Sequence, residues 1–443
     1  MRQQEGSVSQ KPANRARQLL PWFALVVSGL VIAFQLFKPT KALLSTFPLA
    51  EVKAHLTVSG KLKDFVRKQS AQIDELAQHD RVKVPAEIRQ YFELAGNGRW
   101  DDAEKLYASL SQRQQSREPM EDFRPFWRPL QKISGAREVV RSWPAKALLD
   151  YGHFILTSLP PGAIYLAGSD PGYFIPLLLN ETSTGENHPI LSPNALSDES
   201  YLAHVRHLYG ERLNLPNEQD AGKAFSDYVK DAVNRFHHDE QFPNEPRQLR
   251  PGESVEVTGD GRTNVGGAIA VMGINENMIK LLLLQNPKAV FALEESFSFT
   301  SFHSNAIPVG ALIRLAPPLS PSHCTPEQAT ATVQYWKGIH HQLLSDASTS
   351  TASGILGTYA RLASTQASVL QQQNFADAAR RVYQLASELA PANVEITSNY
   401  SQLLVQLGQK AEAMAVAQKA IELDHHNPAL KLLVRTLSAN GDR

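Results

Sequence analysis

The chain of 443 residues has one cysteine, Cys324, and no excess charge, because 44 lysines and arginines balance 44 aspartates and glutamates. A single cysteine excludes an internal disulfide framework and a cysteine-based zinc site. A net charge of zero provides no overall field that would draw the protein to nucleic acid or to acidic lipid. We therefore expect no nucleic-acid partner and no cysteine-held metal.

Complete catalytic motifs are missing as well. The sequence contains no Walker loop, no Gly-x-Ser-x-Gly elbow and no His-Glu-x-x-His pair. The stretch from Gly259 to Asn264 copies the start of the dinucleotide fingerprint, but the third glycine and the acidic ribose partner are absent. These absences favour a non-enzymatic protein that needs no cofactor, without deciding whether any catalysis occurs.

The histidines do not predict a metal site. His237 and His238 are adjacent, and adjacent residues on a helix point about 100° apart, so they cannot both face one metal. His204 and His207 share a helix face, but no carboxylate stands at a matching offset, and zinc needs three or four convergent ligands. We expect these histidines to lie on solvated helix faces.

A long apolar run near the start is the strongest positive signal. Residues Leu19 to Phe37 carry no charge and would cross a hydrocarbon core of about 30 Å as a helix. The run is followed directly by Lys38 and Pro39, which favours a membrane helix over a cleaved signal peptide. Basic residues at positions 2, 11, 15 and 17 favour a cytoplasmic tail over residues 1–18. The sequence thus predicts a single-pass inner (cytoplasmic) membrane protein whose C-terminal body is extracytoplasmic.

Helical patterns occupy residues 52–135. Apolar residues recur at helical spacing from Thr57 to Gln78, which we interpret as an amphipathic helix that forms a stalk outside the membrane. Residues 85–110 contain two such patterns separated by Gly-Asn-Gly, which predicts a helical hairpin.

The hairpin pattern returns near the end of the chain, over residues 358–443. Two segments there align on Ala378 and Ala413, a period of 35 residues (378 to 413). These segments and the early hairpin resemble tetratricopeptide repeats, on Gly98, Trp100, Ala103, Phe375, Ala378, Gly408 and Ala413. The resemblance implies protein binding, but two adjacent repeats fall short of the three usually needed for an independent array. Protein binding and simple packing on the rest of the chain both stay open.

Residues 140–318 alternate short apolar strands, such as 163–167, 289–294 and 311–315, with helical patterns. Strands separated by helices predict crossover connections, and hence an α/β domain whose central, largely parallel sheet carries helices on both faces. We expect a connecting helix at 319–342 and a flexible Ser/Thr-rich linker at 343–357 before the repeats.

Ligands of α/β sheets bind beyond the carboxyl ends of strands, and Gly168, Ser169 and Asp170 follow the strand at 163–167. Asp170 before Pro171 is also typical of a helix N-cap, so the break turns a corner or holds a ligand, and we favour the corner. Asn194 and Glu295 would complete a polar lining of this edge. Glu294 and Glu295 are adjacent and point to opposite faces, so they cannot act together as acid and base without a partner from elsewhere in the chain.

A second resemblance covers residues 145–318. The segments PPGAIYLAGSDPGYFIPLLL, LLLLQNPKAVFALEES and GALIRLAPP are similar to the extracytoplasmic region of bacterial multi-pass proteins related to protein O-mannosyltransferases. The family's membrane part, with its acidic catalytic loop, is absent here. The resemblance implies an accessory domain that handles a glycan, a lipid-linked sugar or a partner protein. We therefore predict a protein-interaction or accessory factor of the cell envelope, and a carbohydrate-active or sugar-binding domain as the alternative.

Overall fold

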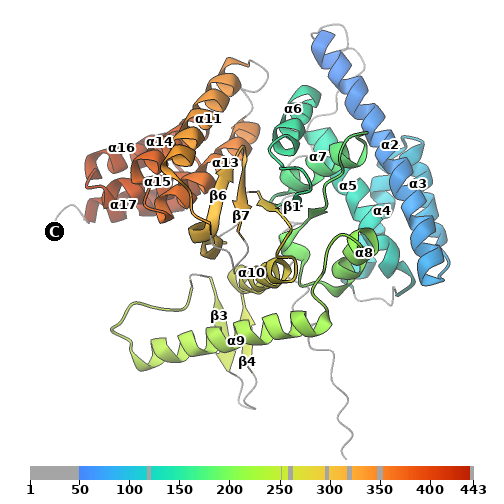
Figure 1. The fold of residues 1–443 in the computed structure, drawn as a ribbon, viewed down its shortest axis with the longest axis horizontal. Helices are drawn as coiled ribbons and strands as arrows, with labels where there is room; N and C mark the ends of the chain where they lie inside the picture. Colours follow the sequence, from blue (N-terminus) through green and yellow to red (C-terminus); the bar gives the residue numbers. More distant parts are fainter. Residues whose placement is uncertain are drawn as a thin grey trace, which may run out of the picture.

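The computed structural model describes residues 49–116, 121–250, 252–257, 263–294, 299–316, 322–346 and 353–439. The predicted cytoplasmic tail and the membrane helix at 19–37 lie outside these described residues. The rest is mostly helical, with helices grouped around a small sheet (Figure 1).

The elements follow one another in three groups. Before the sheet come α2 (Leu49–Asp80), α3 (Ala86–Gly96), α4 (Trp100–Gln115), η4 (Glu121–Phe126), α5 (Trp127–Ser142) and α6 (Ala145–Leu156). The central region contains β1 (Ile164–Leu166), α7 (Asp170–Glu181), β2 (Ile190–Leu191), η5 (Pro193–Ala195), α8 (Glu199–Tyr209), α9 (Glu218–Gln241), β3 (Ser254–Val257), β4 (Thr263–Gly266), α10 (Ala268–Gln285), β5 (Phe291–Leu293), η6 (Thr300–Asn305), β6 (Ala306–Val309) and β7 (Leu312–Leu315). The chain continues with α11 (Pro326–Ser345), α13 (Ser353–Gln372), α14 (Ala376–Leu389), α15 (Val394–Gln406), α16 (Lys410–Leu423) and α17 (Pro428–Ala439).

The main sheet is mixed, in the order β2-β1-β5-β7-β6. β1 pairs in parallel with β2 and β5, whereas β7 is antiparallel to both β5 and β6. The prediction of a largely parallel sheet is therefore wrong. The reason is a short strand, β6, that the sequence analysis missed: it joins β7 through a tight turn at Gly310, and such a turn can only connect antiparallel strands.

Both faces of the sheet are covered by helices, as predicted. Successive strand residues point to opposite faces, so Tyr165 packs in the hydrophobic cluster of α6, α7 and α13. Its neighbours Ile164 and Leu166 pack in a second cluster, with α8 and α10. A separate antiparallel pair, β3 and β4, packs with α9 and the start of α10.

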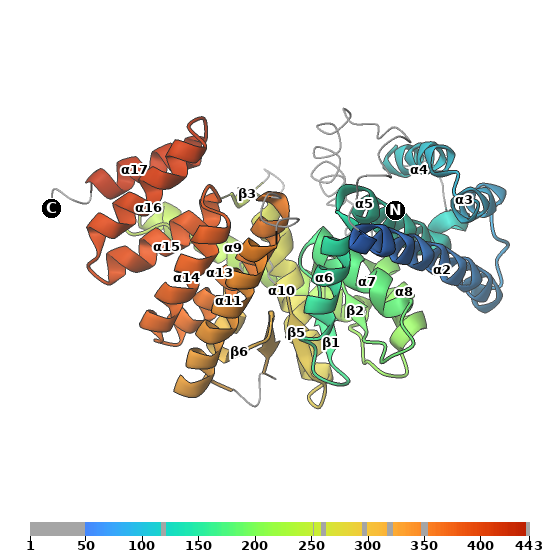
Figure 2. The ribbon, with the colours of Figure 1, turned by 90° about the horizontal axis from the view of Figure 1, so that it is seen from above.

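Helix α2 lies along the body of the protein instead of forming a stalk. Its residues Leu62, Phe65 and Ile73 are buried, and Figure 2 shows α2 alongside α5, α6 and α7. The apolar stripe that predicted the helix is therefore its contact face with the central region. The stalk interpretation is corrected, while the hairpin predicted at 85–110 is confirmed as α3 and α4.

The predicted linker at 343–357 is helical at both flanks. Helix α11 continues to Ser345, and α13 begins at Ser353 with Ile355 and Leu356 already buried. The predicted linker is thus helical at its two ends, and residues 347–352 lie outside the described residues.

Two glutamines, one in α13 and one in the turn that follows it, hold the repeats against the sheet. The Gln366 side chain, which is 1% exposed, donates to the carbonyls of Gly310 and Leu312 at 2.9 Å each and accepts from Trp336 Nε1 at 2.8 Å. The Gln373 side chain donates to the carbonyl of Ala306 at 2.7 Å. Buried backbone groups need hydrogen-bond partners, and these bonds provide them for carbonyl groups of β6, of β7 and of the turn between these strands.

The helical hairpins share one turn geometry. Gly98, Asn374 and Gly408 have positive φ, and the next residue in each turn donates to the carbonyl five positions before it. This is the Schellman pattern of a helix C-terminus. The buried alanine five residues on, Ala379 or Ala413, sets the repeat at 34 residues (379 to 413), which corrects the period of 35 that rested on Ala378.

Within the described residues, α10 is the one helix long and apolar enough to cross a membrane, with a hydropathy of 1.2. Half of that stretch is buried, and Met278, Ile279 and Leu282 lie in the core beneath the sheet. We therefore interpret α10 as a core helix.

Candidate functional site

The carboxyl ends of β1, β2 and β5 meet at one edge of the sheet, because these strands are parallel neighbours. The predicted residues Gly168, Ser169 and Asp170 follow β1, and Asn194 follows β2. Glu294 follows β5 directly. The edge is thus the place where the sequence analysis expected a site.

Glu294 occupies the turn after β1. Its carboxylate is buried, and Oε2 accepts from the amides of Gly168 at 2.7 Å and Ser169 at 3.0 Å. Oε1 accepts from Ser169 Oγ at 2.8 Å and from the Tyr151 hydroxyl at 3.0 Å. Burial raises the pKa of Glu294, and the four hydrogen bonds oppose that rise. The break after β1 therefore turns a corner, and the polar groups of that turn bond the Glu294 side chain.

Gly172 lets the carboxylate approach the first turn of α7. A Cβ atom at this position would lie 1.8 Å from Glu294 Oε1, so any other residue would displace the Glu294 carboxylate. The carbonyl of Gly172 accepts from the buried Tyr165 hydroxyl at 2.9 Å. The position that a phosphate would take at a helix N-terminus is thus filled by Glu294.

Ser169, and not Asp170, is the N-cap of α7. Its Oγ accepts from the Gly172 amide at 3.1 Å, and its backbone is extended, as a cap requires. Asp170 is the first residue of the helix, with Pro171 after it, and it is exposed. The prediction of a cap at this break is right in kind and one residue off.

The other two predicted lining residues do not join the Glu294 cluster. Asn194 is half-buried in η5, where its carbonyl accepts from Asn275 Nδ2 at 3.3 Å. Glu295 lies outside the described residues. Ligand binding at this edge stays a prediction. Sequence reasoning set Glu294 aside, yet its place at the end of a neighbouring strand was the signal that could have paired it with Gly168.

His204 is a buried core histidine. Its burial and the nearby Lys132 and Arg128 cations lower the pKa of its imidazole well below the ordinary value, so the ring stays neutral. His207 packs edge-on against His79, with ring centroids 4.9 Å apart. No group of three or more metal-ligating side chains occurs in the part of the chain that the structure describes.

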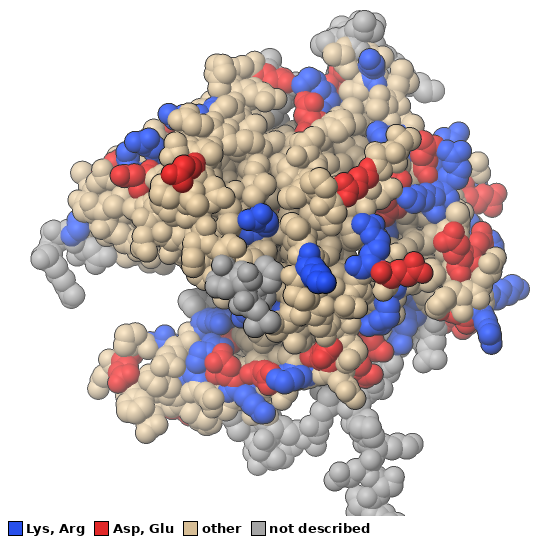
Figure 3. All heavy atoms as spheres, in the orientation of Figure 1, with Lys and Arg blue, Asp and Glu red and all other residues tan. Residues whose placement is uncertain are grey.

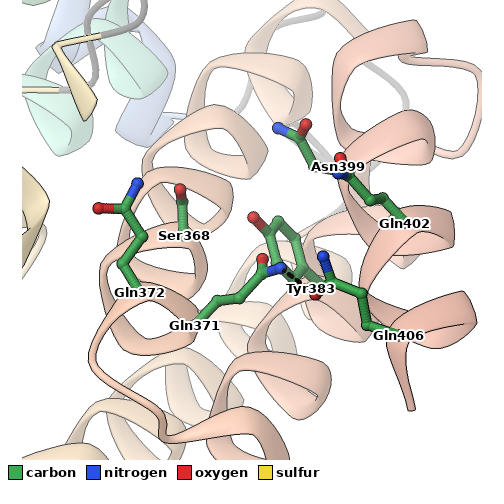
Figure 4. A pocket seen from close by; sticks show the side chains of 7 residues that line it. All are labelled: Ser368, Gln371, Gln372, Tyr383, Asn399, Gln402 and Gln406. Carbon is green, nitrogen blue, oxygen red and sulfur yellow. Dashed lines mark hydrogen bonds between the residues drawn. The ribbon is translucent and has the colours of Figure 1, made fainter. Parts of the chain in front are cut away.

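A second candidate site lies in the repeats. A cavity of about 370 Å³ is lined by α13, α14 and α15, and Figure 4 shows the lining side chains. We call it the amide groove and define it by Ser368, Gln371, Gln372, Tyr383, Asn399, Gln402 and Gln406. The sequence analysis missed this site, although the spacing of the polar residues on each helix could have indicated a shared face.

The groove lining is uncharged. Gln371 Nε2 donates to Gln406 Oε1 at 2.9 Å, which links α13 to α15. Tyr383 is 1% exposed, and Ser368 Oγ lies 3.2 Å from Nδ1 of His303. Burial lowers the pKa of His303 to about 4, so its imidazole, which lies behind Ser368, is neutral at physiological pH.

Charged side chains gather elsewhere. On the face drawn in Figure 3, acidic and basic residues are interspersed over the N-terminal helices and over α9. This mixture agrees with the net charge of zero. It forms no large surface of one sign on that face that would attract a polyanion.

Comparisons with known proteins found a match only for the segment that contains the repeats. A family model described as tetratricopeptide repeat matches residues 369–442, from the end of α13 through α17. No curated protein and no solved structure matches the chain. The predicted repeat resemblance is confirmed for this segment, whereas the resemblance of residues 145–318 to the O-mannosyltransferase-related proteins receives no support.

Proposed function

We propose that the chain is a membrane-anchored protein-interaction factor of the cell envelope, which binds a partner protein through its tetratricopeptide repeats. The observation that carries the proposal is the amide groove, which lies within hairpins that include the family-matched segment. Repeats of this family generally mediate contacts between proteins. Helix α13 and the turn after it join the groove to the sheet, so a partner would be held at a fixed position relative to the body.

The sheet edge gives less support to the alternative, a sugar-binding role. Its best donors, the amides of Gly168 and Ser169, already bond Glu294. A sugar would have to rely on Asp170 and Asn194, which no described contact brings together. A protein-binding role at the repeats is therefore the stronger proposal.

The location of the protein in the cell envelope is a separate part of the proposal. It rests on the uncharged run at residues 19–37 and on the basic residues before it, which favour a cytoplasmic amino terminus. The folded body would then face the extracytoplasmic side, where it is available to partners.

Site-specific photocrosslinking in the native membrane tests the proposal. A photoreactive amino acid replaces Gln402 in the groove, or Gln418 on α16 as the control; both residues are exposed glutamines on helices of the repeats. We expect a discrete protein adduct from position 402 and none from 418. No adduct at either position, or equal adducts at both, would contradict a partner in the groove.

A further inference from the structure

Helix α2 carries a stripe of exposed residues on the side that faces away from the body. The stripe consists of Lys53, Leu56, Gly60, Lys63 and Arg67, which recur every three or four residues and are all exposed. The buried residues of the same helix lie on its opposite side. We call these five residues the outer stripe.

Charge is distributed unevenly along α2. Residues 53–68 contain five lysines or arginines and one aspartate, a net charge of +4, whereas residues 69–80 contain three acidic residues and no lysine or arginine, a net charge of −3. Arg67 pairs with the exposed Asp64, but within the described residues no acidic side chain pairs with Lys53 or Lys63. The first half of α2 therefore presents cations that lack a counter-charge in this chain.

The basic half of α2 is also the half nearest the predicted membrane helix. The uncharged run ends at Phe37 and α2 begins at Leu49, so residues 38–48 connect them. Eleven residues span at most about 36 to 40 Å when fully extended. Residues 53–68 of a helix add only about 24 Å. An anchored chain thus keeps the outer stripe close to the surface of its own membrane.

Leu56 supplies an apolar contact within this basic half. Its side chain is 71% exposed, and it lies between Lys53 and Lys63 along the outer stripe. A single exposed leucine is common on protein surfaces. Its place between two lysines without acidic partners is typical of an interfacial helix, in which an apolar side chain enters the acyl boundary and flanking lysines reach the headgroups.

We propose that the outer stripe of α2 lies on the anionic lipid headgroups of the membrane that holds the chain. This inference rests on the proposed membrane anchoring and specifies how the body is oriented. Salt screens charges beyond about 8 Å, so the local charge of the stripe matters at the surface and the zero net charge of the protein does not. Figures 1 and 2 show α2 and the repeats at opposite ends, so docking would direct the repeats away from the membrane.

The test uses the full chain in nanodiscs of phosphatidylcholine, alone or mixed with phosphatidylglycerol, that contain nitroxide-labelled lipid. A fluorophore is attached at Leu56→Cys, or at Gln418→Cys on α16 as the control, in a Cys324→Ala background; both labelled positions are exposed. Fluorescence lifetimes give the ratio of quenched to unquenched molecules. Thermal melts verify that each labelled variant is folded.

With phosphatidylglycerol present, we expect quenching of the fluorophore at position 56 and none at position 418. Lys53→Gln and Lys63→Gln should each lower the ratio of quenched to unquenched molecules about five-fold, because each cation contributes separately at an anionic surface. The matched change Lys419→Gln, at an exposed lysine of the repeats, should leave the ratio unchanged.

No quenching at position 56, equal quenching at both positions, or the same quenching without phosphatidylglycerol would each overturn the inference. The first outcome is also the one expected if the stripe binds an acidic protein instead of lipid. Failure of docking and failure of the anchor are distinguishable. A chain that the nanodiscs retain but do not quench refutes docking alone, whereas a chain that alkaline carbonate extracts from native membranes refutes the anchor.

Discussion

Replacement of Glu294 tests whether its carboxylate stabilises the turn after β1 by filling the carboxyl edge of the sheet. In Glu294→Ala, the amides of Gly168 and Ser169 lose their acceptor, and each buried unpaired donor costs about 1 to 3 kcal/mol. The hydroxyls of Ser169 and Tyr151 can rotate toward other acceptors, so they add less. Because the loop is half-buried, we expect a loss of about 2 to 4 kcal/mol in the free energy of unfolding.

Glu294→Gln should behave differently. The amide oxygen can accept from the amides of Gly168 and Ser169, and the amide nitrogen can donate to the hydroxyl oxygens of Ser169 and Tyr151. Since burial raises the pKa of Glu294, ionisation adds no net stability over a neutral group. We therefore expect Glu294→Gln to stay within about 1 kcal/mol of the parent at neutral pH.

The sign of the pH dependence follows from the raised pKa. The contribution of Glu294 is complete below the ordinary glutamate pKa and is lost as the pH rises through the higher folded-state value. The parent should therefore gain stability relative to Glu294→Gln as the pH falls through that window.

Urea unfolding of the full chain in detergent, followed by tryptophan fluorescence, measures these differences, with the exposed Glu211→Ala as control. A Glu294→Ala variant within about 0.5 kcal/mol of the parent would refute the assignment, since surface substitutions fall in that range. Equal losses for Ala and Gln would refute the hydrogen-bond argument.

Four further predictions concern His303 in η6, two turns of the repeats and the anchor. Because the pKa of His303 falls from 6.5 to about 4 on folding, stability is lost as the pH drops through this range. Between pH 7 and 5 the parent should lose about 2 kcal/mol more than His303→Asn, and parallel losses in urea melts would contradict this. Gly408→Ala places a side chain at a φ of 77° and should cost about 1 to 2 kcal/mol in a thermal melt. Asn374→Gly, at the equivalent turn, should change stability by less than about 0.5 kcal/mol, and a large loss there would show that the Asn374 side chain has a role of its own. A reporter that is active only outside the cytoplasm, fused after Arg443, should be active, whereas an inactive fusion would invert the topology and a mature protein beginning near Val52 would indicate a cleaved signal peptide.

The sequence predicted much of the candidate edge but not its occupant. Gly168, Ser169 and Asp170 were placed correctly after a strand, because a short apolar run that ends in glycine is a local signal. Glu294 is separated from Gly168 by 126 positions, so no pattern of neighbouring residues could show that its carboxylate fills the turn. The amide groove was missed for a similar reason, since its members come from three helices.

The sequence by itself determined the features that depend on a few consecutive residues. The helical hairpin at α3 and α4, the strands β1 and β5, and the turn at Gly408 follow from periodicity and from backbone preference, which act within about one helical turn. Tertiary structure alone decided the antiparallel direction of β7, the docking of α2 and the burial of Gln366 against the sheet. In each of these cases the energy comes from groups far apart in the chain. A hydrogen bond or an apolar contact stabilises the fold only once its distant partner is in place, and no pattern of neighbouring residues identifies that partner.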